Sequence, residues 1–174
     1  MIDPNAALSA WTAFYTTTAA AAAALTGLMF VVITLVRGTE REKLQDGMST
    51  FSTPTVMEFG MALLASLVMI VPWRSFGSVA ILVGIAAAYG FGYAMRAALR
   101  SRRLTGYIPD AEDLVWFFIL PLIAYAALFA GAVAVAAVPY QALYALGGAV
   151  ALLIFIGIRN AWDIVTYIAM GAND

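Results

Sequence analysis

Four polar residues within or beside long apolar segments are the candidates for chemistry in this sequence. They are Glu58 in "STPTVMEF" and Arg159, Asn160 and Asp163 in "GIRNAWDIVTY". Arg159 and Asp163 are four residues apart, so they share one face of a helix. Ionisable groups inside a membrane are expensive and commonly functional. One interpretation is therefore a buried polar cluster, in which Glu58 pairs with Arg159 and the four residues form a gate.

A structural interpretation of the same residues is also open. Thr55 and Glu58 have the spacing of a capping box, and Pro54 suits the first turn of a helix. On this interpretation Pro54, Thr55 and Glu58 form the first turn of a membrane-spanning helix and have no further role. Arg159 lies roughly 19 residues after the start of the last span, which places it near the membrane interface. There it would form a snorkelling pair with Asp163.

The residue types that are missing exclude most enzyme chemistry. The sequence has no cysteine and no histidine, which removes thiolates, the commonest general base and the commonest metal ligand. Its one lysine, Lys43, stands in a charged loop. A metal site would have to rest on Glu58 and Asp163 alone. We therefore expect no enzyme activity, no catalytic residues, no cofactor and no metal site.

Composition assigns the chain to the membrane proteins. Hydrophobic residues make up 64% of the 174 residues and charged residues 11%, whereas a soluble domain is closer to half apolar and a quarter charged. Five apolar segments are long enough to cross a bilayer. The net charge of −1 gives no nucleic-acid footprint. The sequence thus predicts one all-α transmembrane domain over residues 1–174, with spans at about 11–36, 54–73, 76–98, 114–137 and 140–158.

The positions of the basic residues predict the topology. Loops 37–53 and 96–113 carry seven of the nine Lys and Arg residues, and the positive-inside rule places both loops in the cytoplasm. The N-terminus is then outside and the C-terminus inside. Arg100, Arg102 and Arg103 are expected to meet anionic lipid headgroups. Loop 37–53 is expected to extend the first span as a helical turn that Gly47 stops. The last span either continues to about residue 170 or is followed by a helix at the interface.

Small residues at helical spacing predict where helices pack, because helices in lipid associate through close backbone approach. The third span has such a ridge, and so does the first span, whose six consecutive alanines make it small on every side. That composition predicts a place at the bundle centre or at a subunit interface, with pore lining as a further alternative. The ridges are Ala80, Gly84, Ala88 and Gly92, and Thr16, Ala20, Ala23 and Gly27.

Three stretches carry a resemblance to a known group. They are "AALTGLMFVVITL" (residues 23–35), "FSTPTVMEFGMALLASLVMIVPW" (51–73) and "GIRNAWDIVTY" (157–167). They resemble a widespread group of small multi-span bacterial inner-membrane proteins, some of which are loosely labelled modulators of a membrane-bound protease. The resemblance implies a multi-pass protein of the bacterial plasma membrane and names no activity.

Two functions fit these observations. In the first, a homo-oligomer conducts an ion or small solute, with Glu58, Arg159, Asn160 and Asp163 as its gate. In the second, the chain is a non-conducting accessory or regulatory subunit that binds another membrane protein. The expected partners are the lipid bilayer, further copies of the chain and, in the second case, a membrane-protein partner.

Overall fold

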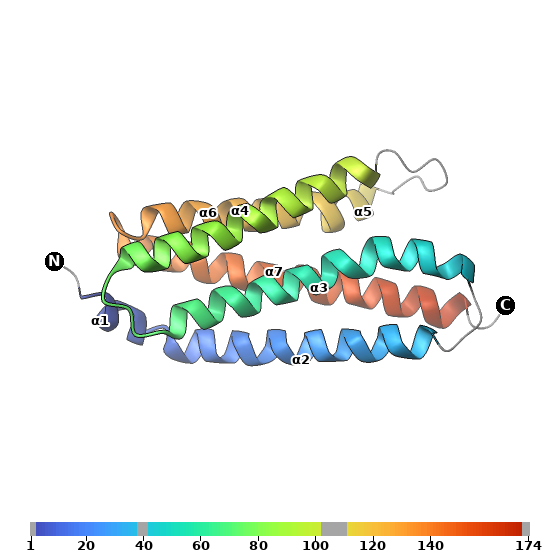
Figure 1. Ribbon diagram of the computed structural model, residues 1–174, viewed down its shortest axis with the longest axis horizontal. Coiled ribbons are helices and arrows are strands. Elements are labelled where there is room, and N and C mark those ends of the chain that lie inside the picture. Colours follow the sequence, from blue (N-terminus) through green and yellow to red (C-terminus); the bar gives the residue numbers. More distant parts are fainter. Residues whose placement is uncertain (1–2, 38–41, 102–110, 172–174) are drawn as a thin grey trace.

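A computed structural model describes residues 3–37, 42–101 and 111–171, and these ranges are almost entirely helical (Figure 1). Their elements in chain order are α1 (Pro4–Ser9), α2 (Thr12–Arg37), α3 (Glu42–Ile70), α4 (Phe76–Ser101), α5 (Ala111–Leu114), the π-helical turn η1 (Val115–Ile119), α6 (Leu120–Ala134) and α7 (Pro139–Gly171).

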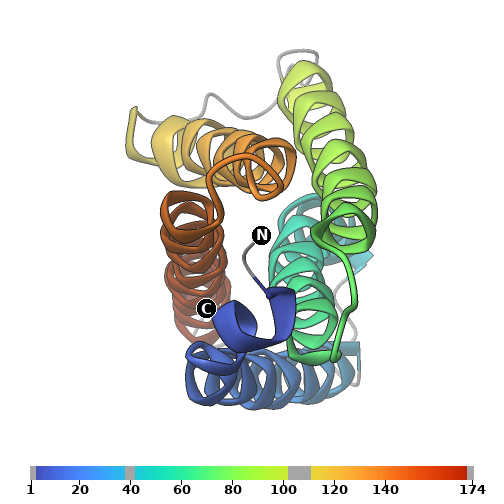
Figure 2. The same ribbon diagram turned by 90° about the vertical axis from the view of Figure 1, so that its left-hand side faces the viewer.

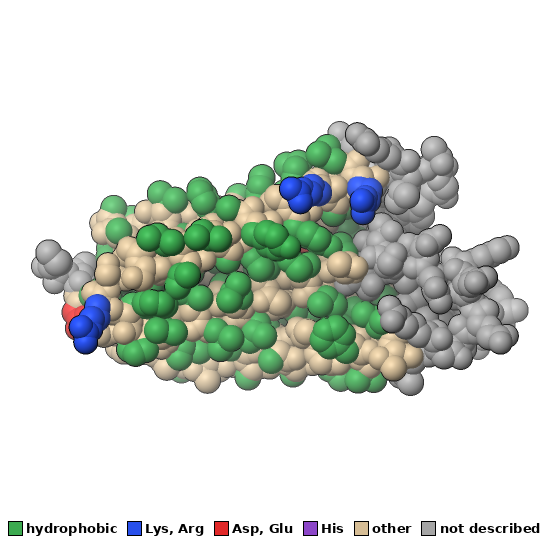
Figure 3. Space-filling model, in the orientation of Figure 1, with side chains coloured by type: hydrophobic (Ala, Val, Ile, Leu, Met, Phe, Trp, Pro, Cys, Tyr) green, Lys and Arg blue, Asp and Glu red, His purple; other side chains and the backbone are tan. Residues whose placement is uncertain are grey.

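Five segments are long and apolar enough to cross a membrane: Thr12–Thr34, Thr53–Ile70, Phe76–Arg100, Val115–Ala134 and Pro139–Thr166. The prediction of an all-α protein with five membrane-spanning helices is confirmed. Figure 3 shows hydrophobic side chains over the middle of one face of the bundle, with the described charged side chains toward its two ends. The orientation of the termini stays a prediction.

The long helices form a ring. Going round it, α2 contacts α3, α3 contacts α4, α4 contacts α6, α6 contacts α7, and α7 returns to α2, while α3 and α7 also contact each other across the ring. Figure 2 looks along this ring and shows α1 lying across one end. We call this end the α1 end and the opposite one, where α5 lies, the α5 end.

Large apolar side chains fill the interior, and glycines let the helices approach. An added Cβ at Gly90 of α4 would lie 2.4 Å from the Tyr125 ring, and one at Gly157 of α7 would lie 2.5 Å from the Phe59 ring. Both positions therefore require glycine for close packing. The largest fully buried apolar side chains are Tyr15, Tyr125, Phe59, Leu128, Leu143, Leu146, Leu153, Ile156, Val79, Val83 and Val135.

The ridge predicted on α4 packs along only part of its length. Gly84 is buried, and a Cβ there would lie 3.8 Å from the Cβ of Ala132 on α6. Ala80 is partly buried and packs against the core. Ala88, however, is exposed, and a Cβ at Gly92 would meet nothing within 4 Å. Residues four apart lie about 40° further round the helix at each step, so the later part of the ridge turns away from α6. Gly90, which is not in the ridge, faces Tyr125 of α6.

Helix α3 begins well before the membrane-spanning segment. It starts at Glu42, so Gly47 does not stop a helix, and Pro54 stands inside α3 rather than in its first turn. The capping-box interpretation of Thr55 and Glu58 is therefore wrong, since neither residue is near a helix start. Both side chains are instead buried inside the bundle. Glu58 is therefore a buried acid inside the bundle and not part of a helix cap.

The structure also decides two alternatives that the sequence left open: whether the last span continues beyond Arg159, and whether the first span lies at the centre of the bundle. Helix α7 continues without a break from Pro139 to Gly171, so the segment after Arg159 prolongs the last span. Helix α2 packs on α3 and α7 as one member of the ring. Only 17% of its span is buried, compared with 33–56% of the other four spans. The predicted position at the centre of the bundle is therefore wrong within one chain.

Candidate functional site

Glu58 and Asn160 meet inside the bundle near its α5 end. Glu58 is five residues from Thr53, where its span begins, which is about 8 Å of helix. Asn160 lies six residues before Thr166, where the last span ends, so the two residues have a similar depth. The side chains are 2% and 0% exposed. The cross-ring contact of α3 with α7 thus places a carboxyl group and an amide together within the apolar part of the structure.

The Asn160 amide is the hydrogen-bond donor to Glu58. Its Nδ2 lies 3.4 Å from Oε1 and 3.3 Å from Oε2 of Glu58, and 3.4 Å from the carbonyl oxygen of Trp116. These contacts are longer than the 2.7–3.2 Å of an ordinary N–H···O bond. The other amide atom, Oδ1, is buried and has no hydrogen-bond partner among the described residues. The site therefore has more acceptor atoms than its one donor group can satisfy.

The π-helical turn explains why a backbone carbonyl faces this site. In η1 the N–H of Leu120 bonds the carbonyl of Val115, five residues earlier. The same pattern would pair the carbonyl of Trp116 with residue 121, which is a proline without an N–H. The Trp116 carbonyl is thus released from the helix and accepts from Asn160 instead. Single π-helical turns of this kind are frequent at functional sites.

Arg159 belongs to a second, more exposed cluster. It forms ion pairs with Asp163, one turn along α7, and with Glu112 of α5. Its guanidinium also lies over the Trp116 ring, 5.8 Å from the centroid. The side chains of Arg159, Asp163 and Glu112 are 30%, 33% and 61% exposed. The structure therefore divides the predicted four-residue cluster, pairing Glu58 with Asn160 in place of Arg159.

Two participants were not among the predicted site residues. Glu112 stands at the start of the fourth span, and nothing in the local sequence shows that it reaches Arg159, 47 residues away. The Trp116 carbonyl is a backbone group, but Pro121 in "ILPLIAY" was a usable signal, because a proline within a span frees a carbonyl. Of the predicted headgroup contacts, Arg100 is exposed at the end of α4, and Arg102 and Arg103 lie outside the described residues.

The ridge predicted on the first span forms an outward surface. Thr16, Ala20, Ala23 and Gly27, which we call the α2 face, are all exposed. A Cβ at Gly27 would meet nothing within 4 Å. The buried side of α2 is one residue, or about 100°, further round the helix, and it consists of Tyr15, Ala19, Ala22 and Met29.

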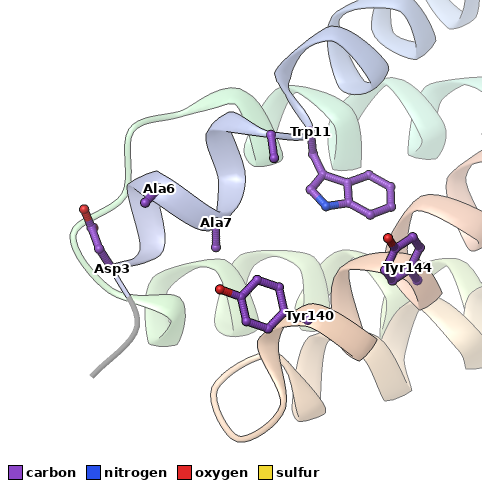
Figure 4. A pocket seen from close by; sticks show the side chains of 7 residues that line it. Asp3, Ala6, Ala7, Trp11, Tyr140 and Tyr144 are labelled. Atoms are coloured by element: carbon purple, nitrogen blue, oxygen red, sulfur yellow. The ribbon is translucent and has the colours of Figure 1, made fainter.

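A pocket of about 400 Å³ lies at the α1 end, between α1 and the start of α7 (Figure 4). Aromatic rings form much of its wall, with those of Trp11 and Tyr144 packed edge to face at 5.0 Å between centroids. Its one carboxylate, Asp3, caps α1 by accepting from the N–H of Asn5. The lining suits an apolar group and is far from Glu58. It comprises Asp3, Ala6, Ala7, Ala10, Trp11, Tyr140 and Tyr144.

No family model, curated protein or solved structure matches this chain. The resemblance to small bacterial inner-membrane proteins therefore stays a prediction. The features of the described structure that bear on function are the Glu58–Asn160 site, the Arg159 cluster and the α2 face.

Proposed function

We propose that this chain is a non-conducting accessory subunit of the bacterial inner membrane, with its N-terminus outside, and that its copies associate through the α2 face. The observation that carries the proposal is the composition of the exposed side of α2. From Thr12 to Ala24 every exposed residue of this helix is threonine or alanine. The exposed side of α4, by contrast, carries Ile81, Ile85 and Tyr89 along its first half. On α2 the large exposed side chains, Leu28, Phe30 and Val31, come after this small segment.

A small, smooth helix face favours a helix over lipid as its neighbour. Small side chains allow two backbones to approach closely, and the resulting van der Waals contact drives association in a bilayer. Within the chain this surface is unused, because α3 and α7 pack on the side of Tyr15, Ala19 and Ala22. The same composition that would pack well in a bundle centre is thus presented to the outside.

The partner that the α2 face fits best is a second copy of the chain. The α2 face has no charged residue, so association needs no complementary charge on a different partner. Two identical small faces can pack on each other about a two-fold axis, in which each supplies the same surface. The proposed protein is accordingly a homo-oligomer, and binding of another membrane protein is the other outcome that the experiment detects.

Disulfide cross-linking tests this proposal in a chain that has no native cysteine. Ala23→Cys stands at the middle of the first span and Ala88→Cys at the middle of the third, and both native alanines are exposed. We expect oxidation in native membranes to give dimers for Ala23→Cys at least tenfold more than for Ala88→Cys. Equal, low yields at the two positions would mean that the α2 face contacts lipid. An adduct of another mass would identify a different partner.

A second function, cation permeation, is favoured by one observation, the buried Glu58. The apolar side chains of Leu128, Leu143 and Leu146 fill the bundle between Glu58 and the α1 end, so conduction would require this layer to open. If it does, proteoliposomes should show a cation flux that Glu58→Gln reduces at least fivefold and that Asp3→Asn, at the α1 end, leaves unchanged. The absence of flux with all three proteins, across ions and pH values, would leave only the accessory function.

A further inference from the structure

We infer that Glu58, Asn160 and the Trp116 carbonyl form a binding site for one monovalent cation, either a proton or Na⁺. This inference does not depend on the α2 face and goes beyond the accessory function. It rests on the burial of the site, on its balance of donors and acceptors, and on the charges around it.

The negative charge of Glu58 needs a partner that the site itself does not supply. Glu58 is 2% exposed and accepts hydrogen bonds from an amide, which is neutral. The described cation nearest to it along α7 is Arg159, which is held by Asp163 and Glu112. A carboxylate inside an apolar medium needs a compensating charge. One bound monovalent cation neutralises the single carboxylate, whereas a divalent cation would leave a net positive charge.

The site also supplies the oxygen atoms that a bound cation needs as ligands. The site contains both carboxylate oxygens, the Trp116 carbonyl released by Pro121, and the unpartnered Oδ1 of Asn160. A half-turn of the amide would put Oδ1 where Nδ2 is, 3.3–3.4 Å from the other three oxygens. Neighbouring oxygens around a cation of the size of Ca²⁺ or Na⁺, at about 2.4 Å from it, are about 3.4 Å apart. The same turn lets Oδ1 accept from a protonated Glu58.

The other described groups that face Glu58 do not neutralise its charge. Tyr93 of α4 and Tyr125 of α6 are close enough to interact with it electrostatically, and both are phenols. On the remaining neighbour, α2, the described side chains include no charged residue. From α7 the facing groups are Asn160 and, in the outer cluster, Arg159 and Asp163. The described cations of α4, Arg96 and Arg100, are exposed, and Arg159 is paired with Asp163 and Glu112. A bound cation is therefore the group that would balance Glu58.

The test is the unfolding temperature of the purified protein in dodecyl maltoside. It is measured in increasing NaCl, with choline chloride holding the ionic strength constant, because a ligand that binds only the folded state raises this temperature. Infrared difference spectra over a pH series then detect the C=O stretch of a protonated buried carboxyl group. The variants are Glu58→Gln, which keeps the shape without the charge, and Asp3→Asn, which as a control removes an exposed carboxylate at the α1 end and keeps a residue that can cap α1.

For a Na⁺ site we expect the unfolding temperature to rise with NaCl in the native protein and in Asp3→Asn, and not in Glu58→Gln. For a proton site we expect no dependence on Na⁺ and a carboxyl band that changes with pH and is missing in Glu58→Gln. A native protein with neither response overturns the inference. If Glu58→Gln does not fold, Glu58→Asp replaces it, and a Na⁺ response or a carboxyl band identical to that of the native protein counts against the site.

Discussion

Replacing Asn160 by leucine is expected to lower the free energy of unfolding by about 1–3 kcal/mol, because the buried carboxyl group of Glu58 loses its hydrogen-bond donor and remains in place. The amide Nδ2 is the donor that reaches both oxygens of Glu58 and the carbonyl of Trp116. Leucine has a similar size and fills the space, so packing alone predicts little loss. Reversible unfolding in mixed micelles of choline dodecyl sulfate and dodecyl maltoside, with choline chloride as the salt, measures the change without Na⁺.

A double-mutant cycle with Glu58→Met separates the polar contact from packing. When both partners become apolar, the unsatisfied carboxyl group disappears together with its donor, and the loss should be largely recovered. We expect a coupling free energy of at least about 1 kcal/mol between the two positions, which is within the range for residues in contact. Additive effects of the two substitutions would show that Asn160 and Glu58 do not act as a pair.

The spans were predictable because each is a long apolar run. The five predicted ranges agree with the five membrane-spanning segments of the structure to within a few residues at most ends. The main departure is the last span, which extends to Thr166. Hydropathy detects such segments well because every helix in a bilayer must present an apolar surface over its whole length. The helix start at Glu42 was missed, because "EKLQDGMSTF" is too polar for a membrane span, although Leu44, Met48 and Phe51 have the spacing of one helix face.

The pairing of polar residues was not predictable in the same way. Glu58 and Asn160 are 102 residues apart, and their contact depends on how α3 and α7 are rotated about their axes. Spacing along one helix could show that Arg159 and Asp163 share a face, and that pair is present. It could not show that Asn160, the next residue, would turn inward while Arg159 turned outward to Glu112.

The direction of the α2 face was ambiguous for a related reason. Six consecutive alanines give every side of the helix the same size, so neither side is marked as the packing side. The signal that was available lies outside the alanines. Tyr15 and Met29 are four turns apart on one side of the helix, and both are buried. The bulky residues, rather than the small ones, indicated which side of α2 faces the bundle.

Gly157→Ala is expected to destabilise the fold by about 1–3 kcal/mol, the range for overpacking a filled interior. The added Cβ would lie 2.5 Å from the ring of Phe59, which is fully buried and therefore cannot move aside. Alanine favours a helix over glycine by up to about 1 kcal/mol, so a tolerated substitution would be stabilising, and the sign of the change is diagnostic. Thermal unfolding in dodecyl maltoside measures it.

Gly148→Ala is the matched control, because Gly148 is on the same helix and a Cβ there would meet nothing within 4 Å. We expect this variant to be as stable as the native protein or more so. Gly157 and Phe59 lie next to the polar pair, since Phe59 follows Glu58 and Gly157 is three residues before Asn160. A Cβ that separates α3 from α7 should therefore also weaken the Glu58–Asn160 contact and, with it, any stabilisation by Na⁺. A Gly157→Ala variant with native stability would show that this helix contact does not set the geometry of the site.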